Sequence, residues 1–467
     1  MLEPTEHARR GAQYAALTDL FRWLGVSPAW LRLAERIETD LQPLWTLRQP
    51  LEEYNQLKVL AALQEQDLTP VALAGSTGYG YGDVGREGLE AAYARVFGAE
   101  AALVRPQIAS GTHALKAALF GLLRPGDTLI SATGAPYDTL QTVIGVRPAG
   151  RKDSGKVHAA GPQADIPHAA GAEGTLRQWG IDYVEVPLTA AHHIDVEALL
   201  QAMRGRRGVV LLQRSRGYSL RPSLSMAELE PALRAVAAHG EGRFRTVVDN
   251  CYGEFVEGRE PPEAGADLAV GSLIKNPGGG LAPSGGYVAG KRDLVEQVAA
   301  SVTAPGLGLE VGATYGWLLP VFQGLFLAPT LVGQALRGAM FAAALWEHLG
   351  FSVSPRPQEE RTDLVQCIVL GEPRRLQQFC QAIQRAGVVD SRARPTAWDM
   401  PGYADQVIMA AGGFISGSSS ELSADAPMRP PYAVFLQGGL VYPQIKLGNL
   451  LAAQEIVGEP PRRERLS

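Results

Sequence analysis

From about residue 71 onward, short apolar runs of strand length alternate with segments in which apolar residues recur every three or four positions. Two of these segments gather apolar residues on one helical face: Leu115, Ala118, Leu119 and Leu122 in one, and Val196, Leu199, Leu200 and Met203 in the other. The apolar runs predict strands near Ala101, Thr128, Tyr183, Leu211, Val247 and Ala269, and a further strand at Gly286–Gly290. Because strands alternate with crossover helices, the pattern predicts an α/β fold with a large, doubly wound, mostly parallel sheet.

The segments outside this pattern predict two smaller units. Residues 1–70 mix charged and apolar residues at helical spacing, which predicts a helical N-terminal arm. Beyond the large domain, 71–332, a helical stretch leads into a segment with fewer strands and more prolines, which predicts a small C-terminal α+β domain over 333–467. Residues 149–174 are polar and rich in glycine and alanine, without periodicity, and predict a flexible surface insertion.

Composition narrows the class of protein. The 467 residues are 46% hydrophobic and 19% charged, as expected of a soluble globular protein with two or three domains. A net charge of -5 with both signs interspersed argues against nucleic acid and membranes as partners and favours a small molecule. The apolar stretch from Tyr315 to Gly333 is broken by prolines and glycines, which favours a buried or interfacial helix over a membrane span. The charged N-terminus lacks a secretory apolar run, so we expect a cytoplasmic protein.

The sequence predicts no metal site. Cys251, Cys367 and Cys380 have no CxxC spacing, which argues against a disulfide framework and against a structural zinc site. His158 and His168 lie in the predicted insertion without a cysteine or carboxylate at ligand spacing, so a mobile loop is the favoured interpretation.

A candidate phosphate site begins the helix that follows the first strand. In "SGTH", Ser110, Gly111 and Thr112 lie where the first N-H groups of a helix lack intrahelical partners and the helix dipole is positive. A phosphate suits this position, and Gly111 permits close approach. Simple capping of the helix by Ser110 or Thr112, without a ligand, is the alternative.

Asp249 and Lys275 each follow a predicted strand. A buried Asp249 needs a cation, either an arginine of the protein or a protonated ring nitrogen of a cofactor. Lys275 comes close to it if the two strands are neighbours. A partly desolvated lysine beside other positive charge has a lowered pKa and becomes a nucleophile, as Schiff-base formation requires. Pairing of Lys275 with a carboxylate at the sheet edge is the alternative.

Taken together, these residues supply what pyridoxal 5'-phosphate (PLP) requires: a lysine for the aldehyde, an aspartate for the ring nitrogen and a helix start for the phosphate. The carboxyl ends of parallel strands are where an open α/β sheet binds its ligand. Tyr137, also at a strand end, could stack on the cofactor ring or be an ordinary half-buried tyrosine.

Two nucleotide motifs are disfavoured. Lys275 precedes its glycines and no helix former follows it, unlike the lysine of a P-loop. "GYGDVG", from Gly80 to Gly85, matches a dinucleotide fingerprint, but its upstream strand is weak and no acidic residue closes a second strand at the expected distance. Tyr79 and Tyr81 alternate with glycines there and form an aromatic loop that could enter a site, including that of a neighbouring subunit.

Four longer stretches resemble a known family: "VVDNCYGEFVE", "GSLIKNPGGGLAPSGGYVAGK", "QRSRGYSLRPSLS" and "LSADAPMRPPYAVFLQGGL". The chain resembles the bacterial aluminium-resistance protein family, a branch of the fold-type I PLP-dependent enzymes related to cystathionine beta-lyase and methionine gamma-lyase. The resemblance covers most of the chain and is most specific around Lys275. It implies a carbon-sulfur lyase acting on an amino acid. An aminotransferase and a PLP-binding stress protein with little turnover are the alternatives, since the same residues begin each path.

The resemblance also implies roles for single residues. Lys275 would form the Schiff base and move the substrate proton, Asp249 would pair with the ring nitrogen, and Tyr137 would stack on the ring. Gly111, Thr112 and Ser272 would bind the phosphate, together with Ser110 at the start of the same helix.

Substrate and subunit contacts are implied less directly. Arg429 would bind the substrate carboxylate, with a surface salt bridge as the alternative. Tyr79 and Tyr81 would reach across the interface of a homodimer or homotetramer with shared sites. Two features depart from the related lyases: Ile274 stands where they have a threonine, and the tyrosine loop lacks their arginine, although Arg86 is nearby.

Overall fold

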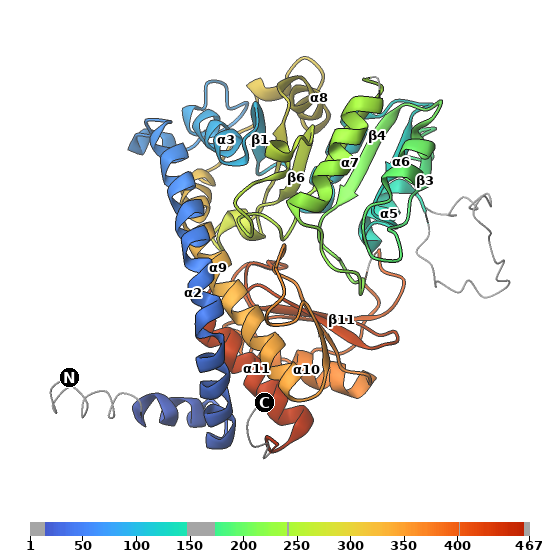
Figure 1. The fold of residues 1–467 in the computed structure, drawn as a ribbon. Helices are drawn as coiled ribbons and strands as arrows, with labels where there is room; N and C mark the ends of the chain where they lie inside the picture. Colours follow the sequence, from blue (N-terminus) through green and yellow to red (C-terminus); the bar gives the residue numbers. More distant parts are fainter. Residues whose placement is uncertain (1–14, 147–172, 241, 401, 462–467) are drawn as a thin grey trace.

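The computed structural model describes residues 15–146, 173–240, 242–400 and 402–461. Its elements form a larger α/β unit and a smaller unit, and two long helices run beside both (Figure 1). The predicted insertion, apart from its last two residues, lies outside the described residues, and so do His158 and His168.

The larger unit is built on a seven-stranded sheet with the order β1-β7-β6-β5-β4-β2-β3. Its strands are β1 (Ala101–Arg105), β2 (Thr128–Ser131), β3 (Asp182–Glu185), β4 (Gly208–Gln213), β5 (Phe244–Asp249), β6 (Leu268–Ser272) and β7 (Gly286–Gly290). Strands β2 to β6 run parallel, and β7 is antiparallel to both of its neighbours. The predicted mostly parallel sheet is therefore confirmed.

Helices cover both faces of this sheet, because side chains alternate between the faces along each strand. The helices of this unit are α3 (Val84–Phe97), α4 (Gly111–Leu122), α5 (Asp138–Ile144), α6 (Val196–Met203), α7 (Met226–His239) and α8 (Arg292–Val302). On β5, Val247 packs into a core with α4 and α8, whereas Val248 packs into a separate core with α6 and α7. Short 3-10 helices lie at Pro70–Leu73, Pro261–Ala264, Asn276–Gly278 and Gly308–Glu310.

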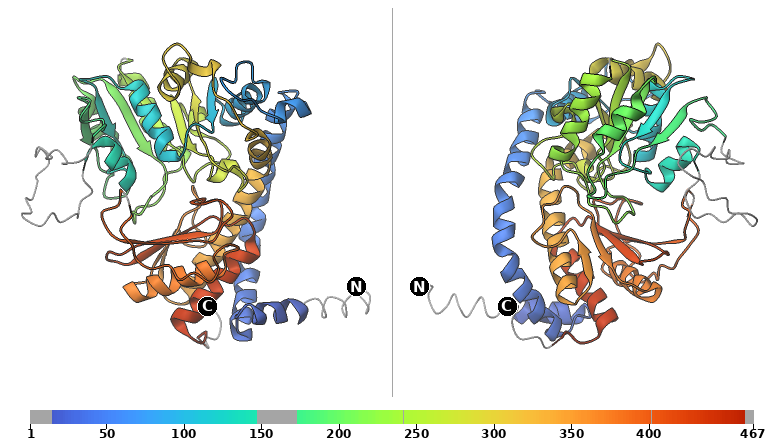
Figure 2. Two further views of the ribbon diagram at one scale, coloured as in Figure 1. Left: turned by 180° about the vertical axis from the view of Figure 1, so that it is seen from behind. Right: turned by 45° about the vertical axis from the view of Figure 1, so that its right-hand side comes forward.

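The smaller unit contains an antiparallel five-stranded sheet with the order β10-β11-β12-β9-β8. The strands are β8 (Ser352–Ser354), β9 (Gln366–Val369), β10 (Val407–Ala411), β11 (Ser423–Pro427) and β12 (Ala433–Gln437). Helices α10 (Pro373–Arg385) and α11 (Tyr442–Val457) share one apolar core with this sheet, away from the larger unit (Figure 2).

Two long helices connect the units. Helix α2 (Pro28–Gln64) packs along α9 (Leu318–His348), and both extend from one unit to the other (Figure 1). The helical stretches on either side of residue 333 are thus one continuous helix, and the domain limits drawn from the sequence stay a prediction. By length and composition α9 could cross a membrane, but half of its apolar 18-residue window is buried inside the fold.

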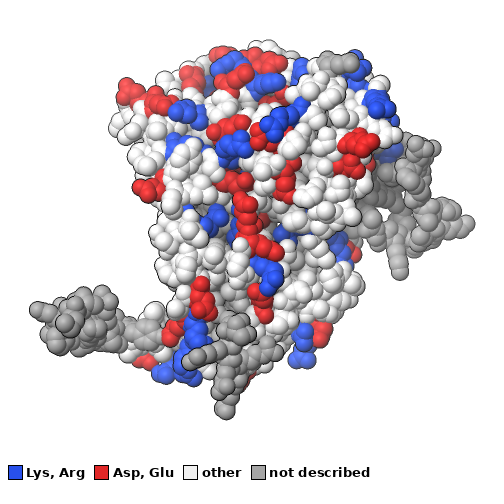
Figure 3. Space-filling view, in the orientation of Figure 1, with Lys and Arg blue, Asp and Glu red and all other residues white. Residues whose placement is uncertain are grey.

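The surface carries charges of both signs. On the face that includes α2, acidic and basic side chains are interspersed without a large area of one sign (Figure 3).

A buried amide fastens α2 to the loop that follows β5. Asn55 is fully buried, and its Nδ2 donates to the backbone carbonyls of Phe255 at 3.0 Å and Glu257 at 3.1 Å. This loop continues directly from Asp249 at the end of β5, so its contact with α2 helps to hold that strand end in place.

We predict that Asn55→Ala lowers the free energy of unfolding by about 2 kcal/mol, because two buried carbonyls lose their donor. The midpoint of urea denaturation, followed by circular dichroism, measures the effect. Glu53→Ala, at an exposed position of the same helix, serves as the control. Equal midpoints for the two variants would contradict the role given to Asn55.

Candidate active site

The site lies at the carboxyl ends of β5 and β6. Asp249 is the last residue of β5, and Lys275 follows the end of β6 by three positions. The two strands are parallel neighbours, with Asp249 opposite Val270. Parallel pairing therefore brings both side chains to one edge of the sheet, where open α/β sheets bind ligands.

A cavity of about 320 Å³ opens at this edge, between the larger and smaller units. Most of the residues predicted from the sequence line it together: Ser110, Gly111, Thr112, Tyr137, Asp249, Ser272 and Lys275. Three predicted residues, Tyr79, Tyr81 and Arg429, lie elsewhere.

Lys275 lies among groups that stabilise its positive charge. Its Nζ is 3.8 Å from the centre of the Tyr252 ring, and Asp249 lies close by. Burial lowers the pKa of Lys275, whereas the acidic groups around it, Asp249 among them, raise it, and the net shift is upward. The predicted lowered pKa is wrong for the protein alone, because no second cation lines the described part of this cavity.

Asp249 is buried, with 4% of its surface exposed. Its Oδ1 accepts the backbone N-H of Cys251 at 3.2 Å. Burial raises the pKa of Asp249, while Lys275 and the hydrogen bonds from Cys251 oppose that shift. A carboxylate in this position suits a cationic partner such as a protonated ring nitrogen.

The features expected of a phosphate site occur together beside Asp249. Helix α4 begins at Gly111, and Ser110 caps it by accepting the N-H of His113 at 3.1 Å. The Oγ of Ser272 is buried without a hydrogen-bond partner among the described residues. A Cβ on Gly111 would lie 3.2 Å from the Cβ of Ser272, so glycine keeps the space between them open. An orphaned hydroxyl next to a helix start fits the phosphate of PLP.

Tyr137 connects the helix start to the neighbouring strands. Its hydroxyl lies 3.0 Å from the Oγ1 of Thr112, and its backbone N-H donates to Oε1 of Gln213 at 2.8 Å. Burial raises the pKa of Tyr137, so the side chain is neutral and its ring is available for stacking.

The smaller unit contributes a wall that residue patterns had not identified. This wall contains Tyr403, Ser419, Ser423, Asp425 and Gln437, and Tyr218 and Tyr252 of the larger unit lie next to it. Burial raises the pKa of Asp425 to about 6. Ser423, Asp425 and Tyr218 fall within stretches that carry the family resemblance, which is the only signal that could have indicated them.

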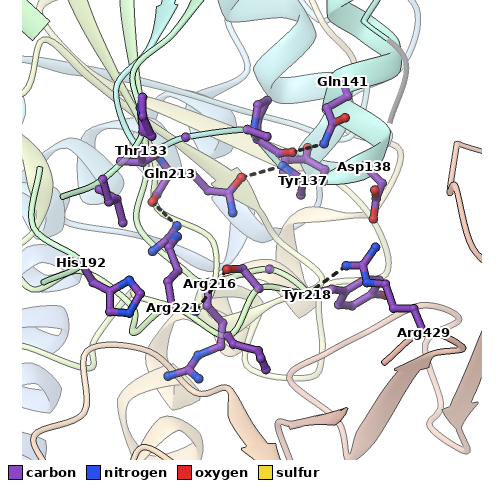
Figure 4. A pocket seen from close by; sticks show the side chains of 18 residues that line it. Thr133, Tyr137, Asp138, Gln141, His192, Gln213, Arg216, Tyr218, Arg221 and Arg429 are labelled. Atoms are coloured by element: carbon purple, nitrogen blue, oxygen red, sulfur yellow. Dashed lines mark hydrogen bonds between the residues drawn. The ribbon is translucent and has the colours of Figure 1, made fainter. Parts of the chain in front are cut away.

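Arg429 faces an adjoining cavity of about 610 Å³, which shares Tyr137, Gln213 and Tyr218 with the first (Figure 4). Its Nη1 lies 2.9 Å from Oδ2 of Asp405, and its Nη2 donates to the carbonyl of Tyr218 at 3.2 Å. The salt bridge considered from the sequence is thus present. Binding of a substrate carboxylate by Arg429 stays a prediction.

Tyr79 and Tyr81 are at the surface, 68% and 63% exposed, and their rings stack with centres 5.6 Å apart. Arg86 is buried and donates to the carbonyls of Gly80 and Gly312, so it holds this loop in place. The residues before the loop form a 3-10 helix and not a strand, which removes the structural context of a dinucleotide fingerprint.

Comparison with known proteins identifies the family and several relatives of this chain. The family model described as methionine gamma-lyase matches residues 30–160 and 165–457. The Bacillus subtilis protein YnbB, whose activity is uncharacterised, is 45% identical over 89% of this chain and 93% of its own length.

Two solved structures are also similar. A Clostridium novyi protein described as a carbon-sulfur lyase involved in aluminium resistance is 40% identical, with a TM-score of 0.85 over 98% of this chain and all of that chain. The PLP-dependent protein YhfS of Escherichia coli shares the fold, with 17% identity and a TM-score of 0.54 over 86% of this chain and 94% of its own.

All three cysteines are reduced and buried, including Cys251 in the cavity wall. Burial raises the pKa of Cys251, Cys367 and Cys380 above the ordinary value, so the thiolate form is scarce at neutral pH. We predict that the native protein does not react with Ellman's reagent within minutes, and that all three thiols react after denaturation in guanidinium. A native thiol that reacts at the rate of free cysteine would contradict this assignment.

Proposed function

The chain belongs to the methionine gamma-lyase family, and on this premise we propose that it is a PLP-dependent carbon-sulfur lyase acting on a sulfur-containing amino acid. The observation that carries the proposal is the placement of Lys275, Asp249 and the start of α4 around one cavity. When bound, PLP withdraws electrons from the α-carbon of an attached amino acid, which permits loss of the α-proton and then of a thiolate.

Three residues at the cavity would have separate roles in this reaction. Lys275 would hold the cofactor through its Nζ and, when free of it, would accept the proton from the α-carbon. Asp249 would favour a proton on the ring nitrogen, because its buried carboxylate is stabilised by a cationic partner. Tyr137 would offer its ring for stacking on the cofactor ring.

We assign the phosphate to the start of α4. The free N-H groups there, the hydroxyls of Ser110 and Thr112 and the orphaned Oγ of Ser272 would donate to it. Ile274 offers no hydroxyl in the place where the related lyases have a threonine. Its backbone carbonyl has a structural role, because it accepts a hydrogen bond from the hydroxyl of Ser418 at 2.9 Å.

We further propose that the active form is a homodimer or a larger homo-oligomer with shared sites. Tyr79 and Tyr81 are exposed aromatic residues on a well-held loop and do not line the cavity of their own chain. Exposed paired tyrosines of this kind suit contact with a second subunit. A cytoplasmic location stays a prediction.

The visible spectrum tests cofactor attachment. We expect purified protein supplied with PLP to show the absorption band of lysine-bound cofactor, and Lys275→Ala to lose both this band and activity by about 10³-fold or more. Lys116→Ala, which removes a lysine outside the cavity, should keep both. Keto acid release from L-cystathionine, L-methionine and L-cysteine measures activity. A wild-type protein without the band would rule out the PLP proposal, and a band without keto acid would favour the aminotransferase or low-turnover alternatives.

Subunit mixing tests the shared site. We expect a Tyr79→Ala/Tyr81→Ala double variant to be inactive, because the loop no longer completes the partner's site. Mixing it in equal amount with Lys275→Ala, with exchange of subunits, should restore about a quarter of wild-type activity, since half of the dimers then contain one intact site. No recovery despite demonstrated exchange would place the two tyrosines outside the active site.

A further inference from the structure

The wall contributed by the smaller unit presents an acidic group to the cavity. Ser423 and Asp425 alternate along β11 with Ala424 and Ala426, which pack into the core of the smaller unit. Alternation along a strand therefore turns Ser423 and Asp425 to the other face, where both line the cavity.

Neutral groups hold Asp425 in place. The Nε2 of Gln437 donates to its Oδ2 at 2.9 Å, and the hydroxyl of Tyr218 also hydrogen-bonds to the carboxylate. These bonds fix the orientation of Asp425 without neutralising it. Burial raises the pKa of Asp425 to about 6 and the charge of Lys275 opposes that rise, so a further cation beside the carboxylate would favour its ionised form.

Asp425 has one cationic neighbour in the cavity. Lys275 is the only lysine or arginine among the described residues that line it, and the proposed function assigns the Nζ of Lys275 to the cofactor and to the α-carbon of the substrate. A buried carboxylate is costly unless it is paired, so a cation that arrives with the substrate would be stabilised here.

The surroundings of Asp425 suit an ammonium group. The rings of Tyr218 and Tyr403 stack with centres 5.7 Å apart, and Tyr252 already faces the ammonium of Lys275. Aromatic faces attract cations, most strongly where water is excluded. The Oγ of Ser423 is buried without a hydrogen-bond partner among the described residues, so it is available to a ligand.

We propose that Asp425 is a specificity-determining residue that binds a second ammonium group at the far end of the substrate. This inference rests on the proposed lyase function and narrows its substrate class to thioethers that join two α-amino acids. Ser423 and the tyrosine rings complete the subsite. A substrate that ends in an alkyl group brings no cation to Asp425, so this residue adds no binding free energy for it.

Two substrates that differ only at the far end test this role. L-Cystathionine and S-ethyl-L-cysteine lose the same bond between Cβ and sulfur, but only the first has a distal ammonium group. In Asp425→Asn we expect kcat/KM for L-cystathionine to fall about 10- to 100-fold, as for a lost hydrogen bond to a charged group, and kcat/KM for S-ethyl-L-cysteine to change less than about threefold. Asp399→Asn, at an exposed position of the same unit, should leave both values unchanged.

Calorimetric titration in a Lys275→Ala background, which stops turnover of both amino acids, measures binding and needs no visible band. We expect Asp425→Asn to weaken binding of L-cystathionine alone. Equal losses for both amino acids would assign Asp425 to a step common to all substrates, and unchanged binding of L-cystathionine would remove it from recognition; either result overturns the proposal. A wild-type protein that binds L-cystathionine through Asp425 but releases no keto acid would instead contradict the lyase function alone.

Discussion

The site depends on the parallel pairing of β5 with β6. This pairing places the carboxyl end of one strand beside that of the other, so Asp249 at the end of β5 lines one cavity with Ser272 at the end of β6 and with Lys275, three residues beyond it. Both strands are buried on both faces, which makes their register rigid. The two strand ends keep their relative position, because the cores on either face of the sheet would have to repack before the strands could separate.

The ionisation of Asp249 and that of Lys275 depend on each other, because both side chains lie at this edge of the sheet. Asp249 and Lys275 share a space from which water is largely excluded, so burial disfavours each charge while the other charge stabilises it. If PLP is held through Lys275, its protonated ring nitrogen would suit Asp249 as a cationic partner.

The strands of the large sheet and several residues of the site could be predicted from the sequence, because they depend on local patterns. The strands of the large sheet follow from apolar periodicity, and Asp249, Lys275 and Gly111 stand where strands end or a helix begins. The direction of the Lys275 pKa shift could not be predicted, because it depends on neighbours such as Tyr252 that only the fold brings close. Asp425 was missed for a similar reason: β11 is a short strand of small residues without an apolar run, and its alternation has meaning only once the partner sheet is known.

The backbone of Ile274 connects the larger unit to the smaller unit. Its side chain cannot supply a hydroxyl, yet its backbone carbonyl accepts the Oγ-H of Ser418 at 2.9 Å and the N-H of Ser419 at 3.3 Å. These bonds join the segment that carries Lys275 to the segment that leads into β11. The position of the lysine is thereby linked to the wall that contains Asp425. Because a backbone carbonyl makes this link, the link itself does not depend on which side chain stands at position 274.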